Sequence, residues 1–141
     1  MGSRRKAREC VLQMLYQYDL SGGEGIDSLV SNFWVCNDQP EDVRFFAEKL
    51  FSGIIEKLGE IDDRISGNST NWKISRMAAV DKNILRLAVF ELLYREDIPI
   101  KVTINEAVEI AKKFGTADSS AFVNGVLDNI AKSVEGKPCE E

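Results

Sequence analysis

The sequence predicts an all-α protein, and two observations support this prediction. Apolar residues recur every three to four positions along most of the 141-residue chain, which is the spacing that lines one face of a helix. The chain has only 3 prolines, and each lies where a helix would begin or end. A chain of this length with 44% hydrophobic residues is long enough for one compact core. We therefore expect about seven helices in two small packed bundles.

The first half of the chain contains three helical patterns. Apolar residues at helical spacing predict helices over residues 4–20, 26–36 and 41–66. The stripe of the first helix contains Ala7, Val11, Met14, Leu15 and Tyr18. A turn-rich run at 67–71 then separates an N-terminal bundle of about residues 1–67 from a C-terminal bundle of about residues 72–134. Together they form a single domain over 1–141.

The second half is expected to contain shorter helices with identifiable ends. Ser75 is expected to cap a short helical turn, and the strong helix that follows ends near residues 96–97. Thr103 is a candidate N-cap with Glu106 three residues later, as in a capping box. Gly115 ends that helix, and Asp118 or a neighbouring serine opens the last one. Residues 135–141 are expected to form a frayed tail.

Charge is distributed unevenly along the chain. The formal net charge is −5, yet residues 1–10 contain four basic residues against one acidic residue. That segment therefore sums to +3 and leaves −8 for the remainder. A small cationic head on an acidic body can serve two ligands of opposite charge. The four cations are Arg4, Arg5, Lys6 and Arg8.

The composition argues against catalysis and against metal binding. Histidine is absent, which removes the usual general base and most zinc sites. The 3 cysteines are widely spaced, so they predict reduced thiols rather than a disulfide framework. Glu106 and Glu109 form a carboxylate pair without a third ligand. No apolar run reaches the ~18 residues that a membrane span requires. We expect no cofactor, no metal and a cytoplasmic protein.

Aromatic residues near the cations indicate a nucleic-acid site. Helical geometry predicts that one face of the first helix, which the core stripe does not use, contains Arg5, Arg8, Leu12 and Tyr16. Guanidinium groups contact phosphates and an aromatic ring stacks on a base, a combination that suits single-stranded RNA. The alternative is that this is a solvated helix start. In the last helix, Asp118 and Phe122 are expected at the rim, where Phe122 is either a second stacking platform or the edge of the core.

Two further charged features have simple structural interpretations. Asp81 is expected in the first turn of a helix, where it interacts favourably with the helix dipole. Glu91 and Arg95 are spaced as an i, i+4 ion pair.

Four segments, taken together and in this order, resemble the NusB family of bacterial transcription antitermination factors. The resemblance extends over nearly the whole chain. The segments are Arg4-Arg5-Lys6-Ala7-Arg8-Glu9-Cys10 with Leu15-Tyr16, Val80-Asp81-Lys82-Asn83-Ile84-Leu85-Arg86 with Glu91-Leu92, Ile104-Asn105-Glu106-Ala107-Val108-Glu109-Ile110-Ala111-Lys112, and Phe122-Val123-Asn124-Gly125-Val126-Leu127-Asp128.

The resemblance implies an RNA-binding protein that works with the small-subunit ribosomal protein NusE on the boxA element of ribosomal RNA leaders. It also implies contact with the RNA polymerase elongation complex and other Nus factors, and a possible homodimer. The implied RNA-binding residues are Arg4, Arg5, Lys6, Arg8, Tyr16, Asp118 and Phe122. Asp81 lies at the implied NusE surface, where some members have the longer glutamate, and Arg76 and Lys82 are its neighbours.

Two alternatives remain open at this point. The chain is an adaptor that binds only protein, or it is a NusB-like RNA-binding subunit of an rRNA-modifying enzyme. A gel-shift experiment with boxA-type RNA, with and without NusE, distinguishes the adaptor from the RNA-binding protein. Methyl transfer by this chain alone would indicate the enzyme.

Overall fold

The computed structural model describes residues 2–68 and 74–134, and these residues form seven α-helices and one 3-10 turn. The helices are α1 (Gly2–Ser21), α2 (Ile26–Cys36), α3 (Glu41–Glu56), α4 (Leu58–Asn68), α5 (Ala79–Tyr94), α6 (Ile100–Phe114) and α7 (Ser119–Ala131), with the turn at Ile74–Arg76. The expected all-α class is confirmed for this part of the chain. The expected tail over 135–141 lies outside the described residues. Within the described ranges, no helix is both long enough and apolar enough to cross a bilayer.

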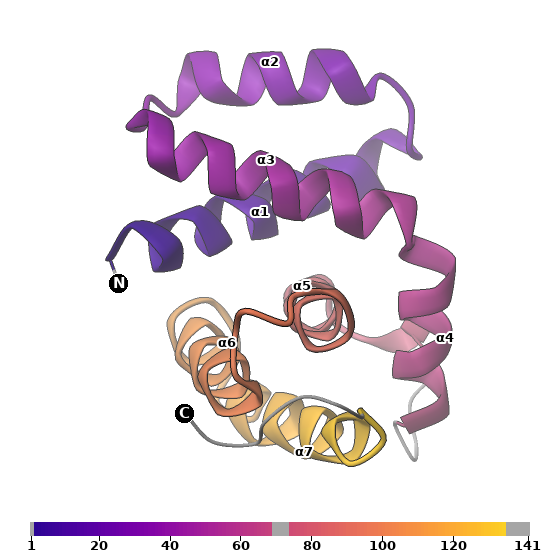
Figure 1. Cartoon of the computed structure of the whole chain (residues 1–141). Coiled ribbons are helices and arrows are strands. Elements are labelled where there is room, and N and C mark those ends of the chain that lie inside the picture. The colour runs from indigo at the N-terminus through magenta and orange to yellow at the C-terminus, as the bar shows by residue number, and fades with distance from the viewer. Residues whose placement is uncertain (1, 69–73, 135–141) are drawn as a thin grey trace.

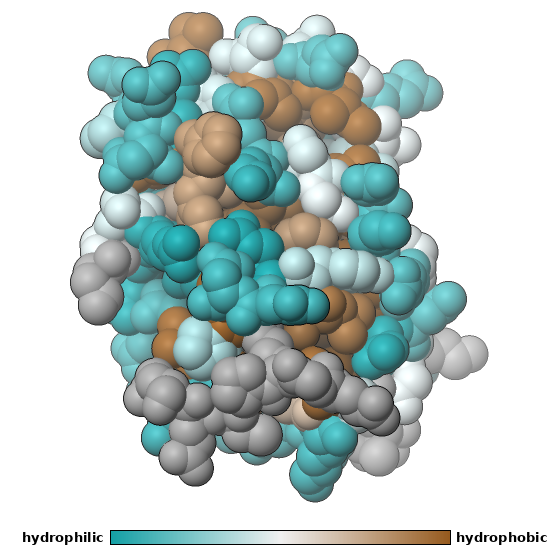
Figure 2. Space-filling view, in the orientation of Figure 1, coloured by the Kyte–Doolittle hydropathy of each residue, from teal (hydrophilic) through white to brown (hydrophobic). Residues whose placement is uncertain are grey.

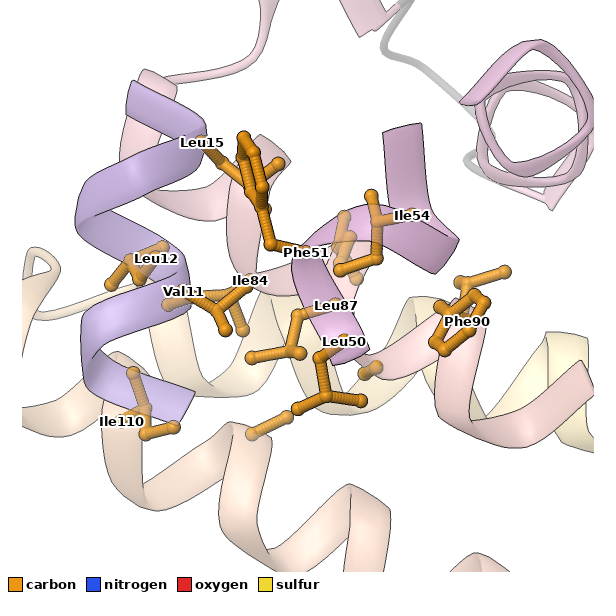
Figure 3. Packing of buried hydrophobic residues seen from close by; sticks show 14 of the residues in the cluster. Val11, Leu12, Leu15, Leu50, Phe51, Ile54, Ile84, Leu87, Phe90 and Ile110 are labelled. Atoms are coloured by element: carbon orange, nitrogen blue, oxygen red, sulfur yellow. The ribbon is translucent and has the colours of Figure 1, made fainter. Parts of the chain in front are cut away.

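Helix α5 is at the centre of the molecule (Figure 1). It packs against α1, α3, α4, α6 and α7, while α1 also packs against α2 and α3. One cluster of buried apolar side chains extends from α1 to α7. Figure 3 shows Val11, Leu50 and Leu87, from three of these helices, pointing toward one another. Because α5 is enclosed by its neighbours, ten of its residues are buried, including Asn83, Arg86 and Glu91.

The single helix predicted over 41–66 is wrong. The structure has two helices, α3 and α4, with a break at Lys57. The apolar spacing runs through the break without interruption, from Ile54 to Leu58, Ile61 and Ile65. Periodicity therefore contains no signal for the bend. After the break, α4 packs against α5 and α7, which buries Ile61 and Ile65 completely.

Both side-chain caps predicted in the second half are also wrong. Ser75 lies inside the 3-10 turn rather than before a helix. Helix α6 begins at Ile100 after Pro99, a full turn before Thr103. Thr103 is buried within the helix and its hydroxyl donates to Glu91 Oε1 at 2.9 Å. Pro99 itself occupies the N-cap position, where no side chain caps the helix and its carbonyl accepts from the Thr103 N–H at 3.2 Å.

Gly53 allows α3 and α5 to approach closely. A methyl group at this position would collide with the ring of Phe90, which is buried. We expect Gly53→Ala to lower the free energy of unfolding by about 1–3 kcal/mol, because the ring must leave its packed position. Urea denaturation measures the change. Gly59→Ala is the matched control, since open space surrounds that helical glycine and alanine favours helix. Equal stabilities of the two variants would contradict the close approach.

Candidate nucleic-acid and partner interfaces

The cationic head occupies the first two turns of α1, and its arginines are held by carboxylates from α5, α6 and the turn between them. Arg5 forms a two-point ion pair with Glu106 of α6, with Nε–Oε1 and Nη2–Oε2 distances of 2.9 and 2.7 Å. Arg4 lies 3.8 Å from a carboxylate oxygen of Asp97. Cations at a helix N-terminus oppose the helix dipole, so external carboxylates stabilise this arrangement. Lys6 is exposed and forms no ion pair with another described residue.

Arg8 does not lie on an exposed face, contrary to the sequence prediction. Its side chain is only 5% exposed. Its Nε and Nη2 donate to the two oxygens of Glu91 at 2.7 and 3.0 Å. Thr103 donates a third hydrogen bond to the same carboxylate. Arg8 therefore connects α1 to α5 and α6 in the interior of the protein.

Residues 7–12 of α1 are all buried because α2, α3 and α5 pack around the helix. Leu12, one turn after Arg8, is also buried. Tyr16 is 49% exposed and lies one turn further on, so the structure separates it from the arginines of the first turn. The predicted pair between Glu91 and Arg95 is likewise replaced, since Glu91 holds Arg8 and the guanidinium of Arg95 pairs with Asp97 at 3.0 Å.

The ion pair with Arg5 controls the protonation of Glu106. Hydrogen bonding from Arg5 lowers the pKa of Glu106 below its ordinary value of 4.5, against the opposing effect of partial burial. The pair therefore stabilises the folded protein fully above that ordinary value and loses this contribution as pH falls through the lowered pKa. We expect Arg5→Ala to raise the pKa of Glu106, which a carboxyl NMR titration measures. Lys112→Ala, which removes the partner of Glu109, is the control and should leave the pKa of Glu106 unchanged.

The structure also reveals a cluster that sequence reasoning missed. The guanidinium carbons of Arg4, Arg95 and Arg8 lie 4.7, 5.2 and 5.8 Å from the centre of the Phe46 ring. Cations over an aromatic face are attracted by its quadrupole. Phe46 therefore helps to orient the head. Nothing in local spacing could reveal this cluster, because its members come from α1, α3 and the end of α5.

A second site is a pocket of about 290 Å³ between the start of α5 and the start of α7. It is lined by Arg76, Met77, Ala78, Asp81, Asp118 and Phe122. The pocket thus brings together residues that the resemblance assigned to RNA and to the protein partner. Phe122 is half-buried at the rim of the core, as predicted, but its pocket contains no residue of α1. One oxygen of Asp81, Oδ1, is buried without a hydrogen-bond partner among the described residues.

Lys82, the remaining predicted partner residue, faces elsewhere. Its Nζ lies 3.1 Å from Asp19 of α1. Asp19 also accepts from buried Arg86, whose guanidinium reaches Asp62 of α4 as well. Burial raises the pKa of Asp19, but hydrogen bonds from Arg86 and Lys82 outweigh it, so the net effect is a lowered pKa. This network joins α1, α4 and α5.

The described residues contain no group of three side chains that could hold a metal ion. Cys10 and Cys36 are free thiols, and Cys139 lies outside the described residues. Burial raises the pKa of the Cys10 thiol. The fold and its two candidate sites are those of a small helical protein.

Comparison with known proteins identifies the family. Residues 5–132 match the NusB family, and the chain belongs to it. The transcription antitermination protein NusB of Geobacter sulfurreducens is 51% identical over 137 residues, which cover 97% of this chain and 99% of the relative. The NusB of Anaeromyxobacter dehalogenans strain 2CP-1 is 52% identical over 136 residues, covering 95% and 94%.

Solved structures share the fold over nearly the whole chain. The crystal structure of T. maritima NusB is 42% identical, covers 92% of this chain and 91% of its own, and superposes with a TM-score of 0.84. A crystal structure of the antitermination factors NusB and NusE in complex with double-stranded RNA is 30% identical, covers 94% and 98%, and also has a TM-score of 0.84.

Proposed function

We propose that this protein is a transcription antitermination factor that binds the boxA element of ribosomal RNA leaders together with NusE. In this role it helps the RNA polymerase elongation complex, with other Nus factors, to transcribe rRNA operons processively in the cytoplasm. The observation that supports this most strongly is near-full-length similarity to NusB proteins, one of which was solved with NusE and RNA. The chain acts by binding and performs no catalysis of its own.

The RNA surface that we propose begins at the head of α1. Arg4 and Lys6 are exposed and available to phosphates, and Arg5 becomes available when its pair with Glu106 opens. Tyr16, half-exposed, offers a ring for stacking. Arg8 acts as a positioning residue, since its guanidinium is used in the interior. Asp118 and Phe122 extend the surface at α7.

The NusE surface that we propose lies around Asp81 and Arg76, with Lys82 at its edge. An acidic body suits a basic ribosomal partner by charge complementarity. Asp81 lines the pocket at this surface, and its buried Oδ1 has no hydrogen-bond partner among the described residues. Because Asp118 and Phe122 line the same pocket as Asp81, RNA and NusE would meet there.

Removing the two exposed cations tests the RNA surface. We expect the double variant Arg4→Ala and Lys6→Ala to weaken binding of boxA RNA in the presence of NusE. For single-stranded RNA, each phosphate contact contributes about −0.7 to the slope of log K against log salt concentration. Loss of two contacts should therefore make the slope less steep by about 1.4. Fluorescence anisotropy over a sodium chloride series measures it. Lys132→Ala, an exposed cation at the far end of α7, should leave the slope unchanged.

An adaptor without RNA affinity of its own is the second candidate function. The ion pairs of Arg4, Arg5 and Arg8 favour it, because they neutralise much of the head. Titration of boxA RNA against the protein alone and with NusE distinguishes the two. Failure to bind RNA in both titrations would support the adaptor and contradict the proposed function.

A further inference from the structure

An open groove of about 890 Å³ lies between α2 and α3, away from both interfaces proposed above. Helix α2 packs mainly on α1, which leaves a gap along its side that faces α3. Ile26 and Val30 from α2, with Phe51 and Ile55 from α3, give the groove apolar walls. Figure 2 shows hydrophobic side chains gathered over this part of the molecule.

Apolar exposure continues beyond the walls of the groove. Val35, which lines it near the end of α2, is 81% exposed. Val35 therefore extends the apolar surface of the groove toward the end of α2.

The charges around the groove are mostly acidic and are arranged unevenly along it. Asp27, Glu48 and Glu56 line it against one cation, Arg44. Since α2 and α3 run in opposite directions, the start of α2 lies beside the end of α3 (Figure 1). Asp27 and Glu56 therefore fall at the same end of the groove. At the other end, the guanidinium of Arg44 lies 5.6 Å from the centre of the Trp34 ring.

Trp34 supplies an independent observation. This residue lines the groove and is only 7% exposed. Its indole Nε1 has no hydrogen-bond acceptor among the described residues. A buried indole N–H usually has a hydrogen-bond partner. Trp34 is therefore a buried residue of the groove wall with an unpaired polar atom.

We infer that this groove binds one amphipathic helix of a partner protein that is rich in basic residues. Its apolar side chains occupy the space between α2 and α3, and its basic residues lie at the end formed by Asp27 and Glu56. Two roughly antiparallel helices present ridges between which a third helix can pack. RNA is excluded as the occupant because the acidic rim repels phosphate. The groove shares no residue with the proposed RNA and NusE surfaces, so this inference stands apart from the proposed function.

The test uses the full chain and two designed helical peptides. The basic peptide has leucines on one face and lysines at one end, and its acidic counterpart has glutamates in place of the lysines. Fluorescence anisotropy of each labelled peptide gives the affinity. The key variant is Asp27→Lys with Glu56→Lys, and the matched control is Asp63→Lys with Asp128→Lys, which changes net charge equally at exposed sites elsewhere.

We expect the wild-type protein and the control to bind the basic peptide equally well. The groove variant should bind it at least about tenfold more weakly and should bind the acidic peptide instead. Val35→Glu should lower the affinity for both peptides. It should not lower the stability of the protein, because the Val35 side chain is exposed. Equal affinities of the groove variant and the control would overturn the inference. So would a concentration-dependent dimer abolished by Val35→Glu, since a second copy would then cover the groove.

Discussion

Replacing Arg8 with alanine is expected to lower the free energy of unfolding by about 3–5 kcal/mol. The substitution leaves the carboxylate of Glu91, which is 1% exposed, without its bidentate partner in the interior. A buried charge that loses its counter-ion keeps its desolvation cost and loses the attraction that offset it. The hydrogen bond that Thr103 donates to Glu91 contributes too little free energy to compensate for this loss. Chemical denaturation followed by circular dichroism measures the loss.

Two further variants separate a buried ion pair from the general effect of losing a cation. Arg5→Ala removes an exposed, solvent-screened ion pair between α1 and α6 and should destabilise the protein far less than Arg8→Ala. Arg8→Met combined with Glu91→Leu replaces both charges by apolar groups of similar size. This double variant should recover most of the lost stability. If Arg8→Ala were no more destabilising than Arg5→Ala, the interior role of Arg8 would be wrong.

Most helices could be located from the sequence because burial imposes a period of 3.6 residues on each of them. The bounds predicted for α2 agree with the structure, and those for α1 differ by two residues or fewer. The bend at Lys57 could not be predicted, because the apolar spacing from Ile54 to Leu58 is the same in a straight helix and a bent one. What decides it is the position of α5 and α7, which are distant in sequence.

The candidate site was less predictable than the fold. Angular position on α1 assigned Arg8 to the same side as Arg5, but only one of the two is exposed. The difference arises from Glu91, 83 residues away, which makes burial of Arg8 favourable. Leu12, four residues after Arg8, was the available signal, because an apolar residue one turn on is unusual on a solvated face. For Phe46 there was no comparable signal.

Replacing Phe122 with leucine is expected to reduce RNA affinity by about 1–3 kcal/mol, because a stacking ring contributes that much per base. Leucine retains an apolar side chain at this partly buried position, so the contact with the core survives. The ring itself is lost. Anisotropy of labelled boxA RNA with NusE measures the affinity, and thermal denaturation checks that the fold is intact. Phe122→Tyr keeps the ring and should retain affinity.

The pocket around Phe122 also predicts how the two ligands are coupled. Asp81 and Asp118 line the same space as the ring, so a bulky cation at Asp81 should affect both the NusE and the RNA contacts. We expect Asp81→Lys to weaken NusE binding directly, and to weaken RNA binding only when NusE is present. Phe122→Leu should weaken RNA binding whether or not NusE is present. Identical patterns for the two variants would mean that the pocket is a single binding site and that our division of its residues is wrong.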